Sequence, residues 1–343
     1  MPFARMARVV MAVGVVALLG SLAAPAHAVT IDWVTVGDPG NAADTAPGFY
    51  GDVADAFQIM KYEFTNQQYA DFLNTVDGNG TNPNSVYNTD MGSDARGGIN
   101  FTPGNASGSK YAVKPNMGDK PVNFVDWFAA ARVSNWLMNG ATGTSSTETG
   151  AYTLVGGTSG TAPAVNNGAT FYIPTDDQWY KAAYYKGGGT NAGYWDFATQ
   201  SDMIPTAVTA DGTGIGSAGS TGNFANYDFV ADWNGQDGNV TSVGTNSGAS
   251  AYGAFDMGGN VFEWNDLNGA AGSSRELRGG GWNSLAAYLS TSIRFPSSPS
   301  YEQSDGGFRL ASPVAVPEPS TVAMALAGLA CGGSVVFRQR RAC

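Results

Sequence analysis

The chain has 343 residues, and its 28 acidic and 17 basic side chains give a formal net charge of −11 at pH 7. Its only histidine, His27, and its only cysteines, Cys331 and Cys343, lie near the two ends. Residues 29–314 therefore contain neither type, and they hold 27 acidic against 12 basic side chains, a net charge of −15. This composition excludes Ser-His-Asp and Cys-His catalysis, zinc sites built on imidazole or thiolate, and a disulfide framework. It argues against nucleic acid as a partner and favours oxygen-coordinated cations.

The first 28 residues have the features of a secretory signal peptide. Arg5 and Arg8 precede an apolar run over residues 9–19, and small residues follow up to an Ala-His-Ala sequence that ends at residue 28. The run is too short to span a bilayer, which argues against the alternative of a retained membrane anchor. We therefore expect export through the inner membrane and removal of residues 1–28.

Three helices are predicted next, each from a capping residue that precedes apolar side chains at helical spacing. The caps are Thr65 paired with Gln68, Asp126, and Thr175 paired with Gln178. The apolar faces of the first two helices comprise Tyr69, Phe72, Leu73 and Val76, and Ala129, Val133, Trp136 and Leu137. Short strands are expected directly before these two helices, at residues 61–64 and 121–125, with a long polar surface loop over residues 77–118.

Two polar motifs have both a structural and a functional interpretation. The adjacent Asp176 and Asp177 suggest acid-base catalysis, but carboxylates in the first turn of a capped helix are also favoured by the helix dipole. Residues 214–219 match G-x-G-x-x-G, yet no apolar strand precedes them and no helix pattern follows. A flexible loop is expected there in place of a nucleotide site.

Short strand-like pieces alternate with glycine turns from Tyr252 onward. They are residues 262–264, 276–278, 293–295 and 308–310. Helices first and short strands later predict one loop-rich α+β domain over residues 29–314, because no charged or proline-rich linker interrupts this segment.

The end of the chain, residues 315–343, has three parts in a fixed order. Pro317-Glu318-Pro319 is followed by 17 mostly apolar residues, 321–337, and then by a cluster of arginines. Such a run can just cross a hydrocarbon core as a transmembrane helix. In this order the segment resembles the PEP-CTERM sorting tail of Gram-negative bacteria that make extracellular polymer. The resemblance implies that the tail holds the protein in the membrane until an exosortase cuts near the motif, which leaves it at the cell surface or in the extracellular matrix.

Six segments of the domain follow one another in an order that is typical of one family. They are residues 62–69, 121–127, 173–179, 253–264, 278–282 and 306–309, and they include Gly-Asn-Val-Phe-Glu-Trp and Gly-Phe-Arg. In these segments the chain resembles the formylglycine-generating enzyme, or sulfatase-modifying factor, family over about residues 50–312. The resemblance implies a variant of the C-type-lectin-like fold with little regular secondary structure, and it implies bound calcium.

The resemblance implies one calcium ion on the segment 253–264. Its ligands would be the side chains of Asp256 and Glu263 and the carbonyl oxygens of Gly259 and Val261. Both side chains supply oxygen, as calcium requires. The alternative is an ordinary strand turn with a solvated acid.

A second calcium ion maps onto Asn226 and the Tyr227 carbonyl, and onto Asp237 and the Asn239 carbonyl. The segment from residue 232 also resembles the start of an EF-hand loop. Asp237, however, stands where that loop needs glycine, and no glutamate ends it. We therefore expect one or two calcium ions, neither of them in an EF-hand.

The catalytic region departs from the family. The family's oxidase chemistry uses two cysteines that bind copper(I), and the matching positions here are Ser284 and Leu289. Neither a hydroxyl nor an isobutyl group can replace the soft thiolate that copper(I) needs. Gly281, Phe262 and Asp305 also stand in place of the family's serine, tryptophan and asparagine. We therefore expect neither bound copper nor formylglycine generation.

The segments around the family's substrate cleft are retained, so their polar and aromatic side chains are candidates for recognising a peptide or a sugar. These candidates are Arg278, Trp282, Ser284, Arg294, Asp305 and Arg309. The alternative is that the arginines make internal hydrogen bonds to carbonyl and carboxylate oxygens.

The features of the two ends and the missing cysteines predict a calcium-stabilised, non-catalytic domain that acts in binding or structure at the cell surface. An extracellular polysaccharide or a peptide would be its ligand. One rival is an enzyme with altered, cysteine-independent chemistry, which would need two carboxylates facing each other across a cleft at roughly 5–10 Å. Another rival is a plain carrier of the sorting signal, which would lack a concave site.

Overall fold

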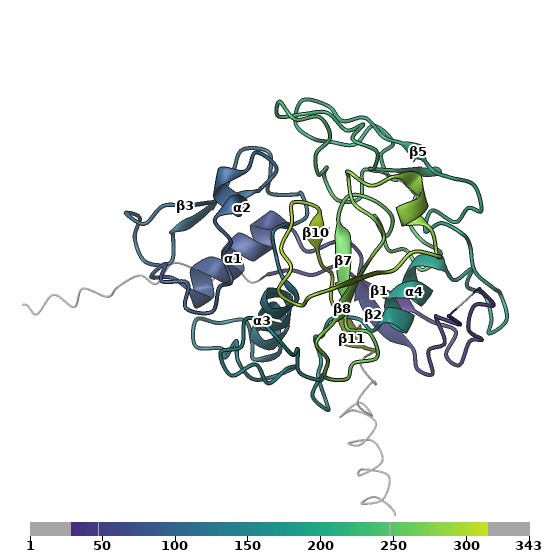
Figure 1. The fold of residues 1–343 in the computed structure, drawn as a ribbon, viewed down its shortest axis with the longest axis horizontal. Coiled ribbons are helices and arrows are strands. Elements are labelled where there is room, and N and C mark those ends of the chain that lie inside the picture. Colours follow the sequence, from purple (N-terminus) through teal and green to yellow (C-terminus); the bar gives the residue numbers. More distant parts are fainter. Residues whose placement is uncertain (1–28, 47, 247, 315–343) are drawn as a thin grey trace, which may run out of the picture.

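Residues 29–46, 48–246 and 248–314 of the chain are described here from a computed structural model (Figure 1). The expected signal peptide and sorting tail lie outside these residues. Small mixed sheets, a few helices and long loops make up an α+β fold (Figure 1). No helix within the described ranges combines the length and the apolar character needed to cross a membrane.

The first sheet joins the start of the domain to its end. Its order is β1-β2-β11, with β1 at Trp33–Val36, β2 at Phe57–Met60 and β11 at Ala311–Pro313. Both pairings are antiparallel, with Ile59 opposite both Val34 and Ala311. The first and last strands of the domain therefore flank the same central strand.

The second sheet has the order β10-β7-β8-β9. Its strands are β7 (Phe262–Asn265), β8 (Arg275–Arg278), β9 (Phe295–Ser297) and β10 (Gly306–Gly307). The β7–β10 pair is parallel and the other two pairs are antiparallel. Two further pairs stand alone: β3 (Ile99–Phe101) with β4 (Tyr111–Val113), and β5 (Thr206–Ala207) with β6 (Phe224–Ala225).

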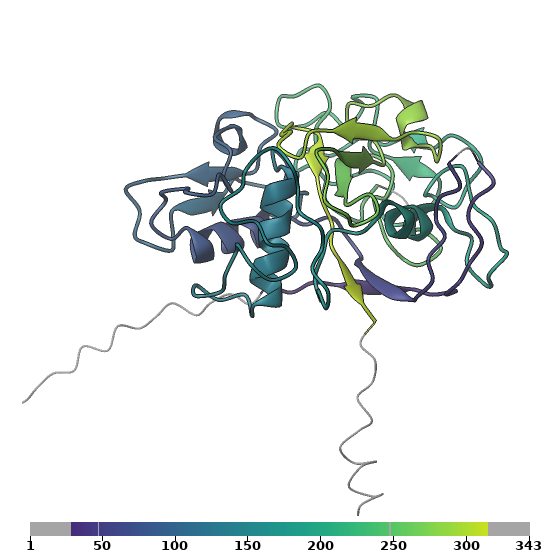
Figure 2. The same cartoon turned by 60° about the horizontal axis from the view of Figure 1, so that its bottom comes forward.

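The helices are α1 (Asn66–Val76), α2 (Asp90–Ser93), α3 (Trp127–Met138) and α4 (Asp176–Tyr184), with a 3₁₀ turn η1 at Ala286–Leu289. The three predicted caps are confirmed. Thr65 and Gln68 form a capping box, as do Thr175 and Gln178, and the Asp126 carboxylate accepts from the Ala129 amide. Helices α1 and α3 lie on one side of β7, β8 and β10, whereas α4 lies with β1 and β2 on the other side (Figures 1 and 2).

Several strand predictions are wrong. Residues 61–64 follow β2, and residues 121–125 contribute only an isolated bridge from Pro121 to Thr65. Phe124 has a φ of 55°, which breaks an extended run. The piece at 308–310 lies between β10 and β11, β9 starts two residues later than expected, and the loop 77–118 contains α2, β3 and β4. Long-range pairing set these boundaries, and local sequence does not encode it.

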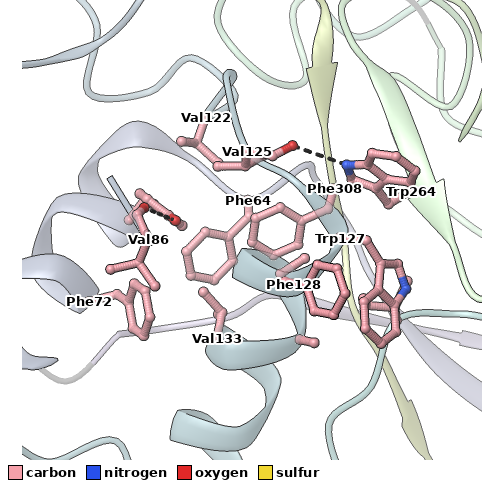
Figure 3. Close-up of a cluster of buried hydrophobic side chains, with 14 of the residues drawn as sticks. Phe64, Phe72, Val86, Val122, Val125, Trp127, Phe128, Val133, Trp264 and Phe308 are labelled. Carbon is pink, nitrogen blue, oxygen red and sulfur yellow. Dashed lines mark hydrogen bonds between the residues drawn. The ribbon is translucent and has the colours of Figure 1, made fainter. Parts of the chain in front are cut away.

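Aromatic side chains form the main core between α1, α3 and β7 (Figure 3). Phe64 and Phe308 stack with their ring centroids 5.0 Å apart. The Trp264 indole donates to the Val125 carbonyl at 3.0 Å, which ties β7 to the segment before α3 (Figure 3). This buried contact holds an inner strand of the second sheet against the helices.

Candidate functional site

A groove of about 370 Å³ opens on one face of the second sheet. Its lining residues come from β7, β8, β9, η1 and the loops that flank them. They are Phe262, Leu277, Asn283, Ser284, Leu285, Tyr288, Phe295, Tyr301 and Asp305. The lining is mainly apolar with a few polar groups, which is the usual composition of a ligand site.

The sheet register explains why the apolar residues meet. Leu277 lies opposite Phe295 in the β8–β9 pair and opposite Trp264 in the β7–β8 pair. Phe262 is two residues before Trp264, so it shares the same face of the sheet. Glu263, Glu276 and Arg278 consequently face the other way.

The close approach of Gly281 to Asp305 places Asp305 at the side of the groove. A Cβ atom on Gly281 would lie 3.0 Å from the Asp305 Cβ, so a larger residue at position 281 would push the two segments slightly apart. The Asp305 carbonyl accepts from the Phe262 amide at 2.7 Å, and the Ser284 hydroxyl accepts from the Gly281 amide at 2.9 Å. These contacts fix Asp305 and Ser284 at the groove.

The aromatic rings in the groove are exposed to an unusual degree. Tyr288, Phe295 and Tyr301 have exposed fractions of 38%, 41% and 37%. Phe262 lies behind them, with ring centroids 6.2 Å from Tyr288 and 5.9 Å from Phe295. Clustered exposed rings in a folded domain indicate an interaction site.

Several polar groups of the groove have no partner. Within the part of the chain that the structure describes, no hydrogen bond or ion pair reaches the Asp305 carboxylate, the Asn283 side chain or the hydroxyls of Tyr288 and Tyr301. Polar groups left unpaired beside exposed rings are available to a ligand.

Two of the six cleft candidates, Ser284 and Asp305, line the groove. Leu289, the other position that carries a cysteine in the resembled family, does not. Its side chain is 1% exposed and packs with Phe197, Ala225 and Tyr227. The two positions therefore face different surroundings.

Arg278 and Arg309 lie in the interior. They make the internal hydrogen bonds to carbonyl and carboxylate oxygens that were considered as the alternative to ligand binding. Arg278 pairs with Asp176, and its Nη1 donates to the Ile293 carbonyl at 2.9 Å. Arg309 forms a bidentate salt bridge with Glu263, and both of its N–O distances are 2.6 Å. Both arginine side chains are fully covered, so neither faces the groove.

Trp282 and Arg294 also lie outside the groove. The Trp282 ring is buried beneath the Arg96 guanidinium, 4.3 Å from its centroid. Arg294 pairs with Asp176 at 3.0 Å and with Glu276 at 2.9 Å. It lines a second hollow of about 270 Å³, on the opposite face of the β8–β9 pair.

The first expected calcium site is a buried cluster of carboxylates. Asp256 accepts from the Gly244 amide and from the Asn246 side chain, while both oxygens of Glu263 bind Arg309. A third acid, Glu63, joins them and accepts from the Asn260 side chain at 2.9 Å. Glu63 was not among the expected ligands.

The cluster contains three acids and one guanidinium. Burial raises the pKa of Glu63 well above its usual range, and the charges of Asp256 and Glu263 raise it further, while Arg309 lowers it. Burial also raises the pKa of Asp256. Glu63 and Asp256 form no ion pair among the described residues. Three carboxylates thus share one guanidinium.

The second expected site is assembled in part. The Asn226 side chain donates to the Asn239 carbonyl at 2.9 Å, and its Oδ1 is buried without a hydrogen-bond partner among the described residues. Asp237, by contrast, has an exposed side chain, and its carbonyl accepts from Arg96. The structure therefore brings together Asn226 and Asn239 and leaves Asp237 at the surface.

Comparison with known proteins identifies the family. A sequence profile described as "Sulfatase-modifying factor enzyme 1-like domain" matches residues 34–314. The chain belongs to the sulfatase-modifying factor family. A second profile, the PEP-CTERM protein-sorting motif, matches residues 315–341, which marks the chain as an exported protein sorted by exosortase-type machinery. No curated protein matches the chain.

Three solved structures align with most of the chain. They are CarF (20% identity, TM-score 0.48, 83% of this chain and 99% of that chain), Treponema denticola variable protein 1 (20%, 0.46, 84% and 98%), and PvdO from Pseudomonas aeruginosa (18%, 0.41, 83% and 92%).

The chemistry of the carboxylate cluster fits the family's calcium. Buried carboxylates without a cation are costly, and a hard divalent ion prefers such oxygen donors. The unpaired Asn226 Oδ1 fits a cation in the same way. Within residues 29–46, 48–246 and 248–314, however, no three His, Cys, Asp or Glu side chains converge in a geometry that could hold a metal ion. Main-chain oxygens would have to complete either site.

The groove residues that sequence reasoning missed are mainly aromatic. Tyr288 and Tyr301 lie in segments rich in serine and proline, and Phe295 ends the strand expected at 293–295, and no periodicity there predicts which side chains are buried. Rings in such segments are a weak signal of an exposed apolar surface. For Glu63, the signal was its place directly before the capped helix, inside a segment shared with the family.

Proposed function

We propose that this chain is an exported binding protein whose ligand, a segment of extracellular polysaccharide or of a peptide, lies in the groove on the second sheet. The observation that carries the proposal is the grouping of exposed rings with the unpaired Asn283 and Asp305. Flat rings supply contact area at little conformational cost, and the polar groups supply orientation.

The export features complete this proposal. Residues 1–28 would be removed as a signal peptide, and a transmembrane segment in the tail would hold the protein until it is cut. The mature protein would then act at the cell surface or in the extracellular matrix. The domain would be a variant of the C-type-lectin-like fold.

Calcium is proposed as a structural ion. Asp256 and Glu263 with the Gly259 and Val261 carbonyls would hold one ion, and Glu63 lies in the same buried cluster. The burial of three acids around a single guanidinium supports that assignment, because carboxylate oxygens are the donors that calcium prefers. Asn226, with its unpaired oxygen, would contribute to a second ion together with the carbonyls of Tyr227 and Asn239.

The enzyme alternative draws less support from the groove. Among the described residues, Asp305 is the one carboxylate that lines the groove, whereas glycoside hydrolysis uses a pair. In the second hollow, Asp176 is bound to Arg278 and Arg294, and Asp177 accepts from the Gly51 amide. These carboxylates already have partners within the fold.

The test is binding by full-length protein in detergent to extracellular polysaccharides and to peptides. We expect Tyr288→Ala with Tyr301→Ala to weaken binding about tenfold or more, since rings at the centre of a site carry much of its affinity. Phe49→Ala is the matched control, because Phe49 is 71% exposed and does not line the groove. Equal affinity of the double variant and the unchanged protein would refute the proposal.

A further inference from the structure

The groove combines ring faces with a single negative charge. Phe262, Tyr288, Phe295 and Tyr301 line it, and the Phe262 ring stands at 84° to Tyr288 and at 40° to Phe295. Tyr288, Phe295 and Tyr301 are each more than one-third exposed, so part of each ring is open to a ligand. The face of an aromatic ring carries negative charge density and attracts a cation placed over it.

Asp305 is the only charged residue that lines this space, and within the described ranges no cation pairs with it. Its charge acts on the neighbouring ring, since burial and then the Asp305 carboxylate raise the pKa of Tyr301. This lining contrasts with the interior, where Arg278 and Arg309 both have carboxylate partners. The groove thus has a carboxylate and ring faces but no positive charge.

We propose that the groove is an aromatic cage for an ammonium group, and that its ligand is an amine-bearing saccharide of the extracellular polymer. This inference rests on the proposed binding function and specifies its ligand. The ammonium would lie over the rings of Tyr288 and Phe295, with the Asp305 carboxylate as its counter-charge.

A saccharide fits the polar groups better than a lysine side chain does. The amide of Asn283 and the hydroxyls of Tyr288 and Tyr301 have no partners among the described residues. A lysine would cover them with its apolar stem, and covered polar groups without partners are unfavourable. The hydroxyl groups of a sugar ring can bond all three while the amine faces Asp305.

The ammonium cage can be tested by calorimetric titration of the full-length protein in detergent. The two ligands are oligosaccharides of equal length, a glucosamine oligomer and its fully N-acetylated form. At constant pH and ionic strength we expect the amine form to bind about tenfold more tightly. Asp305→Asn should remove most of that preference. The control is Asp228→Asn, an exposed acid whose amide donates to the Ser284 carbonyl next to the groove.

Each of the other outcomes would refute one specific part of the proposal. If the acetylated oligomer binds as tightly as the amine form, the ammonium cage is wrong but the binding function stands. If Asp228→Asn lowers the preference as much as Asp305→Asn, general surface charge is responsible and the cage is wrong. If an oligolysine peptide binds in the groove and neither oligosaccharide does, the saccharide assignment is wrong. If no polysaccharide or peptide binds in a way that depends on Tyr288 and Tyr301, the proposed function fails too.

Discussion

The charged groups on the inner face of the second sheet have partners, whereas several polar groups at the groove have none among the described residues. On the inner face, Glu263 and Arg278 are buried and each has an oppositely charged partner. On the groove face, Asp305 and Asn283 border exposed rings and have no partner among the described residues. In β7 and β8, Glu263 and Arg278 face the inner side, whereas Phe262 and Leu277 face the groove.

The difference separates structural charge from functional charge. A buried ion pair holds the fold only while both partners are present, because an unpaired buried charge is strongly destabilising. An unpaired carboxylate at the surface costs the fold little and remains available to a ligand. The arginines of this domain therefore belong to its stability, and the groove belongs to its proposed binding.

Removing the Arg309 charge should have the largest effect on stability. Arg309→Met would leave Glu63, Asp256 and Glu263 buried without a cation, and we expect the free energy of unfolding to fall by about 3–5 kcal/mol. Chemical unfolding followed by tryptophan fluorescence measures this. Lys110→Met is the control and should change stability by less than about 0.5 kcal/mol, because the Lys110 ammonium bonds exposed carbonyl groups.

A double variant sharpens the same point. Glu263→Leu with Arg309→Met replaces the pair by apolar groups and should recover most of the lost stability. A loss below about 1 kcal/mol in Arg309→Met alone would mean that the carboxylates take up protons in place of the cation, and the view of this face as an ion-pair network would be wrong.

Calcium should stabilise the inner face and not the groove. At a free concentration about 100 times the dissociation constant, an ion that binds only the folded state adds about 2.7 kcal/mol. We expect this gain, measured by melting in calcium and in chelator, to disappear in Asp256→Asn and to persist in Asp305→Asn. A gain that survives in Asp256→Asn would place the ion elsewhere, and no gain in the unchanged protein would refute the calcium proposal.

Stability should also depend on pH through the cap of α3. Burial raises the pKa of Asp126 to about 8, although its carboxylate accepts from the Ala129 amide at 2.7 Å. The folded state therefore holds this proton more tightly than the unfolded chain, whose aspartate titrates near 3.9. The stabilising contribution is full below about pH 4 and is lost as the pH rises to about 8, by at most about 1.4 kcal/mol per pH unit.

Asp126→Asn tests this sign, since asparagine keeps the cap acceptor and removes the titration. Urea unfolding of both proteins across the interval should show a weaker pH dependence in the variant. Parallel curves would mean that Asp126 is ionised in the fold and that other acids cause the dependence.

The elements that sequence predicted correctly are those decided locally. A capping box involves residues three apart, so Thr65 with Gln68 and Thr175 with Gln178 were sufficient to place the starts of α1 and α4. The strand expected at 121–125 does not form because Phe124 adopts a positive φ and makes contacts that are distant in sequence. One of them is the hydrogen bond from its amide to the Gln303 carbonyl. No local pattern encodes such a contact.

The candidate site shows the same limit. Alignment to the family pointed to Ser284 and Asp305, and both line the groove. It also pointed to Arg278, which is adjacent in sequence to the groove residue Leu277 but lies on the opposite face of β8. Which face a residue occupies depends on strand register, and a shift of one residue reverses it. The rings of Tyr288 and Tyr301 come from irregular segments that only the folded chain brings together.

Groove substitutions should change stability least, which completes the contrast. Tyr288 and Tyr301 are more than one-third exposed, so Tyr288→Ala and Tyr301→Ala should each alter the free energy of unfolding by less than about 0.5 kcal/mol. The same variants should weaken ligand binding, a separation that a structural role for these rings would not produce. A loss above about 1.5 kcal/mol would show that the rings hold the sheet together, and the exposed aromatic wall would then belong to the fold and not to a ligand.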